Sequence, residues 1–483
     1  MRTYSRPSRA PVVLVPLVLA MLLSACSFAP HMAQPQAEAE LPPDFDLAES
    51  DTLRPMTQWW AVYNDPVLNQ LIDTTLVRNL DLRAAASRVV EVQHQYRIAR
   101  SGRLPSVQVA GDVTRSDTPA NVGFTSELPG LPERFENETY SISGTLAYEA
   151  DIWGRLRNQQ NAALSEFYAT QEDYRAIQMG VVVEAIGTYF EILDVEAQLR
   201  LTQTNVELLQ ERIDRTEERF AQGSVSSFEL YSLRQEFENT RTNLPLLEAS
   251  LSDAEGRLGV LLGMYPSEAA TFLDATRAPD LVLAPIPAGL PSDLLRERPD
   301  VAAAIHRLEA ARQNIGAAKA SLLPSLPMTV TGGIQSPDLG ELLNTSQYFT
   351  SITRSLTAPL FQGGALRANV RVTEAKYAQL VASYEKTLRT AFNEVQVTLI
   401  SYDKQRERYA VLQDELAYAQ ASVEGQEARY RSGVGDYLAY LDARRNLVRV
   451  QTTLASAERS VADARLAVHR ALGGAWVEDD PAL

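Results

Sequence analysis

Two stretches of the sequence, "RFAQGSVSSFELYSLRQEF" at residues 219–237 and "RYRSGVGDYLAYLDARRNL" at residues 429–447, have the same plan. In each, a long helical pattern is interrupted by a short segment of glycine and small residues and then resumes. Glycine ends helices because it adopts the left-handed conformation without steric cost. Each stretch therefore predicts the turn of a helical hairpin, and the two turns lie 210 positions apart.

Other parts of the chain after about residue 60 also occur twice. "DLRAAASRVVEVQHQYRIARSGRLPS" (81–106) aligns with "DVAAAIHRLEAARQNIGAAKASLLPS" (300–325) at an offset of 219, and "WGRLR" (153–157) aligns with "GGALR" (363–367) at 210. Collinear matches at nearly constant offset indicate that one structural unit was duplicated. We expect each copy to contain a helix, a strand pair, a very long helix, the glycine break and a second long helix.

The longest helical patterns run over about 155–221 and 365–431. Apolar residues recur there in steps of three and four, as in coiled coils, and neither run contains proline. A helix of about 65 residues is about 100 Å long at 1.5 Å per residue. These segments are therefore predicted to be rods rather than helices of a globular domain.

Four shorter segments alternate with a period of two and predict strands: 107–115, 140–152, 327–335 and 349–360. Lengths of about 9–13 residues suit tilted transmembrane strands, and a soluble hairpin is the alternative. Four strands cannot close a membrane barrel, which needs about eight or more. Transmembrane strands would therefore require several chains to share one barrel, because an open edge in lipid leaves backbone groups unpaired.

The N-terminus has the pattern of a signal peptide. Three arginines precede an apolar stretch at 12–23, which is too short to span a bilayer as a helix. The following "LSAC" resembles a bacterial lipobox, and this implies covalent N-acyl and S-diacylglycerol lipid on Cys26. An incidental cysteine after an ordinary signal peptide is the alternative. Cys26 is the chain's only cysteine, which excludes an intrachain disulfide, and Ser27 after it favours the outer membrane. No other stretch is predicted to span a bilayer as a helix.

Composition and motifs argue against several classes of function. The net charge of −16, with no basic cluster, argues against a nucleic-acid partner. The four histidines are scattered, and the chain has no zinc-binding HExxH, no phosphate-binding GxxxxGK[ST] and no GxSxG nucleophile elbow. The sequence therefore predicts neither an enzyme nor a metal site, and no cofactor besides the lipid.

Six segments in order resemble those of one family: "QWWAVYNDPVLNQLI" (58–72), "ERPDVAAA" (297–304), "LPSL" (323–326), "PLFQGGALRA" (359–368), "YLAYLDARRNL" (437–447) and "LGGAW" (472–476). Together with Cys26, these segments are distributed along nearly the whole mature chain. The chain resembles the TolC-like outer-membrane efflux proteins, and in particular their lipoprotein branch, the OprM/NodT-type factors of RND efflux systems.

This resemblance implies a mainly α fold with a small transmembrane β part. The expected assembly is a homotrimer with one 12-stranded β-barrel in the outer membrane of a Gram-negative bacterium and one 12-helix α-barrel in the periplasm. The implied function is that of a passive exit duct. Its implied partners are a periplasmic adaptor (membrane fusion protein), an inner-membrane RND-type pump reached through that adaptor, and outer-membrane lipid.

The expected domains follow the duplication. They are a lipoprotein signal peptide (1–25), a lipidated extended segment (26–60), repeat 1 (61–265; β-hairpin about 105–153, helical hairpin about 155–263), an equatorial connector (266–289), repeat 2 (290–474; β-hairpin about 324–361, helical hairpin about 364–472) and a C-terminal tail (475–483).

The resemblance also implies a periplasmic gate at Tyr430, Leu438 and Asp442. Leu438 and Asp442 are four residues apart and so share a helical face. A trimer would present rings of three leucines, which dewet a pore, and of three carboxylates, which favour cations and titrate as a coupled unit that attracts protons or a metal ion. The alternative is that Asp442 is a solvated helix charge near Arg444 and Arg445.

The family's tip turns dock against the adaptor, which implies docking at Gln222, Gly223, Ser224, Ser432, Gly433 and Val434; a plain helical turn is the alternative. One feature departs from the family. TolC has a basic residue where this chain has Gly435 and a second acid where it has Ala439. The contact between basic and acidic side chains that locks the TolC constriction closed therefore cannot be carried over to this chain. Glu229, Arg444 and Arg445 are the candidate lock partners.

Two other functions fit the same sequence. One is the outer-membrane channel of a type I protein secretion system, which would share the architecture. The other is a lipidated periplasmic coiled-coil scaffold without a pore, which would lack transmembrane strands.

Overall fold

The computed structural model describes residues 59–119, 134–265, 267–268 and 298–473. The expected signal peptide, Cys26, nearly all of the connector and the C-terminal tail lie outside these residues. The described residues divide into two compact units, one built from 90–119, 134–169 and 305–383 and the other from 59–89, 170–265, 267–268, 298–304 and 384–473. Each unit is described by itself.

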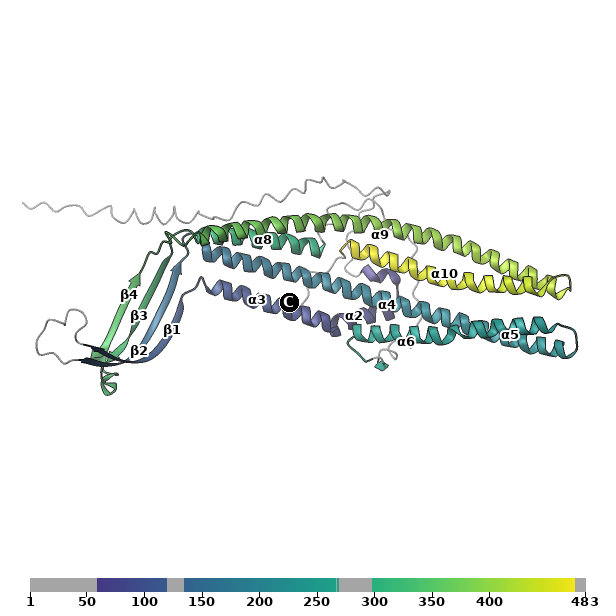
Figure 1. Ribbon diagram of the computed structural model, residues 1–483, viewed down its shortest axis with the longest axis horizontal. Helices are drawn as coiled ribbons and strands as arrows, with labels where there is room; N and C mark the ends of the chain where they lie inside the picture. The colour runs from purple at the N-terminus through teal and green to yellow at the C-terminus, as the bar shows by residue number, and fades with distance from the viewer. Residues whose placement is uncertain (1–58, 120–133, 266, 269–297, 474–483) are drawn as a thin grey trace, which may run out of the picture. The chain divides into compact units, whose positions relative to one another are not determined.

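The first unit contains a four-stranded antiparallel sheet in chain order (Figure 1). Its strands are β1 (Ser106–Pro119), β2 (Arg134–Ala150), β3 (Leu326–Ser336) and β4 (Tyr348–Arg354), with short 3-10 turns η4 (Leu339–Glu341) and η5 (Thr345–Gln347) before β4. Each copy contributes one hairpin, and β2 pairs with β3 to join them. The expected strand pairs are confirmed, but β4 ends before 360. Beyond it Thr357 makes only an isolated bridge to Ser325, and Pro359 has no N–H to donate.

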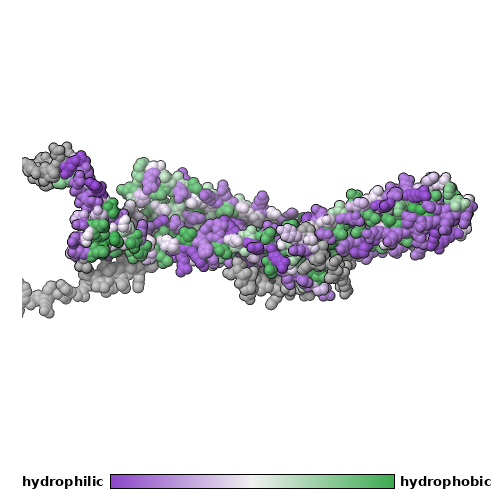
Figure 2. Space-filling view, turned by 90° about the horizontal axis from the view of Figure 1, so that it is seen from below, coloured by the Kyte–Doolittle hydropathy of each residue, from purple (hydrophilic) through white to green (hydrophobic). Residues whose placement is uncertain are grey.

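The two faces of the sheet differ in polarity. One row across the four strands consists of exposed apolar residues, namely Val107, Leu146, Val330 and Ile352. The adjacent row, on the opposite face, is polar: Gln108, Thr145, Thr331 and Ser351. Figure 2 shows hydrophobic residues gathered over the strands. The sheet therefore leaves an apolar face without cover from the described residues of its own unit.

The chain turns from each hairpin into a long helix at a glycine with positive φ. These are Gly154 (φ 71°) and Gly364 (φ 83°), which are 210 positions apart. In the first copy the carboxylate of Asp151 caps the helix by accepting from the N–H groups of Leu156 (3.0 Å) and Arg157 (2.7 Å). The local sequence thus fixes both helix starts.

The long helices α4 (Arg155–Ala221) and α9 (Ala365–Arg431) each have 67 residues, and this confirms the two predicted rods. In the second copy one helix, α10 (Tyr437–Ala471), returns from the turn. In the first copy the prediction of one continuous returning helix is wrong. The segment that returns from the turn is divided at Thr242 into α5 (Ser227–Arg241) and α6 (Asn243–Leu261). Pro245 causes the break, since it cannot donate an N–H to the carbonyl four residues earlier.

The second unit has its main core where η1 (Trp59–Tyr63) and α2 (Pro66–Arg78) pack on α4, α6 and α10. Asp65 caps α2 and also accepts a hydrogen bond from the Tyr189 hydroxyl of α4 (2.8 Å). One stretch of α4 is long and apolar enough to cross a membrane, contrary to the expectation from sequence. Half of that stretch is buried inside the chain, and core residues of α4 such as Ile186 and Tyr189 account for its apolar character.

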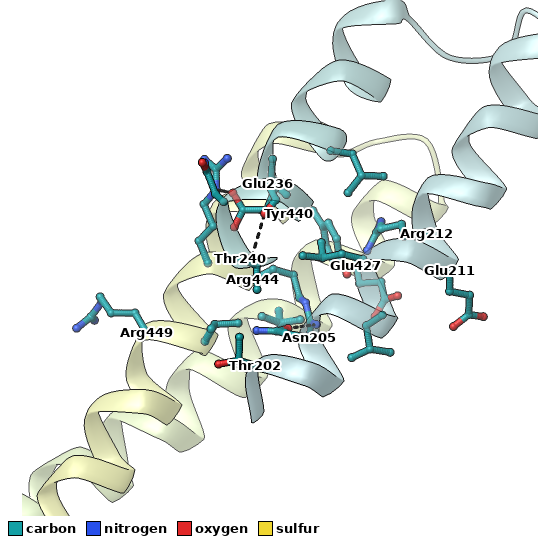
Figure 3. A pocket seen from close by; sticks show the side chains of 18 of the residues that line it. Thr202, Asn205, Glu211, Arg212, Glu236, Thr240, Glu427, Tyr440, Arg444 and Arg449 are labelled. Carbon is teal, nitrogen blue, oxygen red and sulfur yellow. Dashed lines mark hydrogen bonds and ion pairs between the residues drawn. The ribbon is translucent and has the colours of Figure 1, made fainter. Parts of the chain in front are cut away.

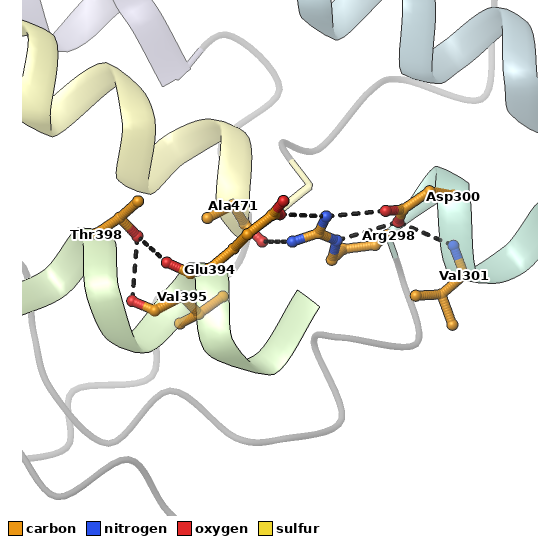
Figure 4. Close-up of polar contacts among 7 residues, drawn as sticks. All are labelled: Arg298, Asp300, Val301, Glu394, Val395, Thr398 and Ala471. Atoms are coloured by element: carbon orange, nitrogen blue, oxygen red, sulfur yellow. Dashed lines mark hydrogen bonds and ion pairs between the residues drawn. The ribbon is translucent and has the colours of Figure 1, made fainter. Parts of the chain in front are cut away.

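In each copy, the side chain just before the short helix donates a hydrogen bond to a carbonyl at the end of that copy's helical hairpin. Before α3 (Leu80–Ser101), the Asn79 amide donates to the carbonyl of Leu261 (2.9 Å). Before α8 (Pro299–Ala320), Arg298 donates to the carbonyl of Ala471 (2.7 Å; Figure 4). The two side chains occupy equivalent positions of the duplication, and each satisfies a helix C-terminal carbonyl.

Arg298 makes further contacts that Asn79 is too short to make. Its guanidinium, which is almost fully buried, also contacts the carboxylates of Glu394 (2.8 Å) and Asp300 (2.9 Å). Figure 4 shows the arginine between the end of α10, helix α9 and the start of α8. One cation therefore links three helices of the second unit.

Candidate functional site

The two hairpin turns, which are the tips of the helical hairpins, have the same backbone structure. Gly223 (φ 73°) and Gly433 (φ 75°) adopt the left-handed conformation. The N–H groups that follow them donate back to the last helical turns, from Ser224 to Arg219 (2.8 Å) and from Val434 to Arg429 (3.1 Å). Ser226 and Asp436 then cap the returning helices. The duplicated glycine thus has the conformational role that the sequence predicts.

Gly435 is required for a different reason. A Cβ at this position would lie 2.8 Å from the Cβ of Arg429 and 2.9 Å from the backbone nitrogen of Tyr430. Its own N–H donates to the Arg429 carbonyl (2.9 Å). A basic side chain therefore cannot stand here without displacing the turn.

The six residues expected to contact an adaptor are all exposed at the turns: Gln222, Gly223, Ser224, Ser432, Gly433 and Val434. Val434 is the large apolar residue among them. The turns therefore present backbone groups and one apolar side chain to solvent.

Leu438 and Asp442 lie on the exposed side of α10, whereas Tyr437, Tyr440 and Leu441 are buried behind them. The Asp442 carboxylate is 72 % exposed and lies 3.6 Å from the Arg445 guanidinium. Within one chain Asp442 is thus a solvated charge with an arginine neighbour. The described part of the chain contains no group of three or more His, Cys, Asp and Glu side chains arranged to hold a metal ion.

Tyr430 does not share that exposed face. Its ring lies half-buried beside Tyr437 and Tyr440, with ring centroids 5.4 and 6.3 Å away. Its hydroxyl donates to the Glu229 carboxylate of α5 and accepts from Arg219 of α4 (3.1 Å). Burial, and then the bond to Glu229, raise the pKa of Tyr430. Tyr430 therefore joins the second hairpin to the first.

Three more polar contacts join the two hairpins near the tip. Arg212 of α4 contacts the hydroxyl of Tyr440 and lies over its ring, 3.9 Å from the centroid. Arg444 donates to the buried Asn205 of α4 (3.3 Å), and Arg445 pairs with Glu236 of α5 (2.6 Å). We call these three contacts and that of Tyr430 the inter-hairpin links.

The candidate lock partners are thus distributed over different links. Glu229 contacts a tyrosine, Arg445 contacts Glu236 as well as Asp442, and Arg444 contacts Asn205. Sequence reasoning missed Arg212, Asn205 and Glu236. Only Glu236 carried a usable signal, because it lies 209 positions before Arg445 and so at nearly the same height on the equivalent returning helix.

The links border a cavity of about 1120 Å³ between the two hairpins (Figure 3). Residues from α4, α5, α6, α9 and α10 line it, and the labelled side chains of Arg212, Asn205, Glu236 and Arg444 come from both hairpins. The lining between the hairpins is therefore polar as well as apolar, and the links connect its two walls.

Comparison with known proteins gives consistent results over nearly the whole chain. A family model described as "Outer membrane efflux protein" matches residues 71–264 and 290–474. The chain is 33% identical over 469 residues to the toluene efflux pump outer membrane protein TtgC of Pseudomonas putida, covering 95% of each chain. It is 32% identical over 478 residues to the pyoverdine export outer membrane protein OpmQ, also of Pseudomonas putida, covering 97% of this chain and 98% of the relative. The solved structure of the outer-membrane channel OprN matches with a TM-score of 0.85 and 26% identity, covering 93% of this chain and 100% of that chain.

Proposed function

Since the chain belongs to the outer membrane efflux protein family and is the outer-membrane component of an efflux system, we propose that it is a passive duct closed by a gate at its hairpin tips. The single observation that supports the gate best is the set of inter-hairpin links. They lie next to the exposed Leu438 and Asp442, and they provide polar contacts that an opening movement would have to break.

We propose that three copies assemble. The sheet supports this, because β1 and β4 each have an edge without a partner strand among the described residues, and one face carries exposed apolar rows. In lipid, unpaired backbone edges cost several kcal/mol per group, which pairing between copies removes. Three copies of four strands give the 12 strands of a closed barrel with an apolar outer face, and six hairpins give the 12-helix periplasmic part.

In such a trimer the exposed face of α10 forms the constriction. Leu438 forms an apolar ring and Asp442 an acidic ring, and the two rings lie one helical turn apart. Carboxylates about 6 Å apart repel by about 3 kcal/mol per pair at an effective dielectric near 20. Arg445, at 3.6 Å from Asp442, offsets part of this repulsion and so takes part in holding the ring.

The inter-hairpin links take the place of the lock that Gly435 rules out. Each joins the α9–α10 hairpin to the α4–α5 hairpin, so outward rotation of one hairpin relative to the other breaks them. Opening is then a change between two states that a partner biases by binding the open one more tightly.

The exposed turns are the proposed docking surface for a periplasmic adaptor, which connects the duct to an inner-membrane RND-type pump. Relatives of nearly equal identity are named for toluene efflux and for pyoverdine export, two chemically different cargoes. This supports selection of the cargo by the pump rather than by the duct. A lipid on Cys26, which precedes the described residues, would add a second attachment to the outer membrane.

The experiment is to purify the full chain and insert it into planar bilayers. A trimer that resists dissociation in detergent and conducts ions supports the duct. A monomer without conductance supports the scaffold instead. Deletion of the gene for the inner-membrane pump separates efflux from type I secretion. Loss of solute export supports the proposed duct, and loss of export of a protein supports the secretion channel.

A further inference from the structure

The cavity between the hairpins is strongly basic, although the whole chain is acidic. Seven arginines and three glutamates line it, which is an excess of four positive charges in a chain of net charge −16. The lining includes no lysine and no aspartate. The cavity therefore has a local charge opposite to that of the protein.

The three glutamates are already paired within the cavity wall: Glu211 with Arg215, Glu427 with Arg431 and Glu236 with Arg445. Arg449 pairs with Glu415, which does not line the cavity. The remaining three arginines have neutral hydrogen-bond partners in the described structure: Arg212 with Tyr440, Arg219 with Tyr430 and Arg444 with Asn205. The Tyr430 hydroxyl also joins Arg219 to the Glu229 carboxylate, so Arg212 and Arg444 are the arginines whose charge is least compensated.

Arg212 and Arg444 come from opposite hairpins and reach across the cavity in opposite directions. Arg212 of α4 contacts Tyr440 of α10, and Arg444 of α10 contacts Asn205 of α4. The two contacts are separated by seven residues on α4 and four on α10, which is about 6–10 Å along the helices. Each guanidinium has five N–H donors and uses only part of them in these contacts.

A guanidinium is suited to oxyanions because its planar fork donates two parallel hydrogen bonds to phosphate or carboxylate oxygens. Two forks several ångströms apart match an anion with two such groups better than a single phosphate. We propose that this cavity binds a small multivalent oxyanion, such as a diphosphate or a polycarboxylate, between Arg212 and Arg444.

The bound anion joins α4 to α10 and adds to the inter-hairpin links. It therefore stabilises the arrangement in which the hairpins lie together, by an amount that grows with its concentration. This consequence for gating rests on the proposed function, whereas the binding site itself does not.

Isothermal titration calorimetry of the full-length protein in detergent, at low ionic strength, tests the site with inorganic pyrophosphate as the probe. The expected result is saturable binding of one pyrophosphate per chain, tighter than that of inorganic phosphate. R212M and R444M should each weaken binding at least about tenfold, because each removes a charge-assisted pair of hydrogen bonds. R444K keeps the charge but not the fork and should weaken binding less than R444M.

The matched control is R389M, which removes one exposed charge of α9 outside the cavity. Equal weakening by R389M and R444M, or no saturable binding at millimolar pyrophosphate, overturns the site. In bilayers, pyrophosphate on the periplasmic side should lower the open probability of the wild type but not of R212M. Binding without any effect on opening overturns the coupling alone, and a wild type that does not conduct overturns the duct, whatever the calorimetry shows.

Discussion

Replacement of Tyr430 by phenylalanine removes one inter-hairpin link and leaves the ring packing in place. The lost hydroxyl donates to Glu229 and accepts from Arg219, so two charge-assisted hydrogen bonds disappear. Both partners are partly exposed, and water replaces much of the lost interaction, so the cost is about 1–2 kcal/mol per chain. The ratio of open to closed tips should therefore rise about 5–30-fold per chain, and further if three chains open together.

Single-channel recording in planar bilayers measures this directly as open probability. Tyr231→Phe is the matched control, because Tyr231 lies on α5 near the same tip but is largely exposed. Y430F should open more often than the wild type, and Y231F should not. An unchanged open probability in Y430F, or an equal increase in both variants, would show that this link does not hold the tip closed.

Three further predictions concern stability. R298M leaves the Ala471 carbonyl and two carboxylates without their cation and should lower the unfolding free energy by about 3 kcal/mol, seen in chemical denaturation. Burial lowers the pKa of His469 to about 4, so the unfolded chain binds more protons between pH 6.5 and 4, and stability should fall by up to about 3 kcal/mol as the pH drops through that window. H469Q should show a smaller fall in stability over the same pH range. An identical fall would contradict the attribution of this pH dependence to His469. G433A should destabilise the tip by about 1–2 kcal/mol because of its positive φ, whereas G425A, inside α9 with open space at its Cβ, should not, as hydrogen exchange at the turn would report.

The large features of the fold could be predicted because they repeat. The rods α4 and α9 follow from a long apolar periodicity without proline, and the offset of 210 residues placed both turns. The strands were located by alternation, although β4 proved shorter. The break between α5 and α6 was not predicted, although Pro245 signals it, because a proline inside a continuous helix costs a hydrogen bond.

The site was less predictable, because its contacts join segments more than 200 residues apart. Tyr430, Leu438 and Asp442 were grouped by resemblance, yet Tyr430 contacts the first hairpin while the other two face solvent. The partners of Arg212 and Arg444 depend on how the two hairpins are rotated about their axes, which periodicity within one helix does not specify. The equivalence of Asn79 and Arg298 was present in the 219-residue offset, but the shared carbonyl contact becomes visible only in three dimensions.

The most direct test of the gated duct is the single-channel conductance of the L438A/D442A double variant beside that of the wild type. Both side chains are exposed on α10 and lie outside the inter-hairpin links, so the variant should fold and assemble normally. We expect higher conductance and weaker preference for cations, because the apolar and acidic rings are both removed. Unchanged conductance and unchanged cation preference in a correctly assembled variant would contradict it.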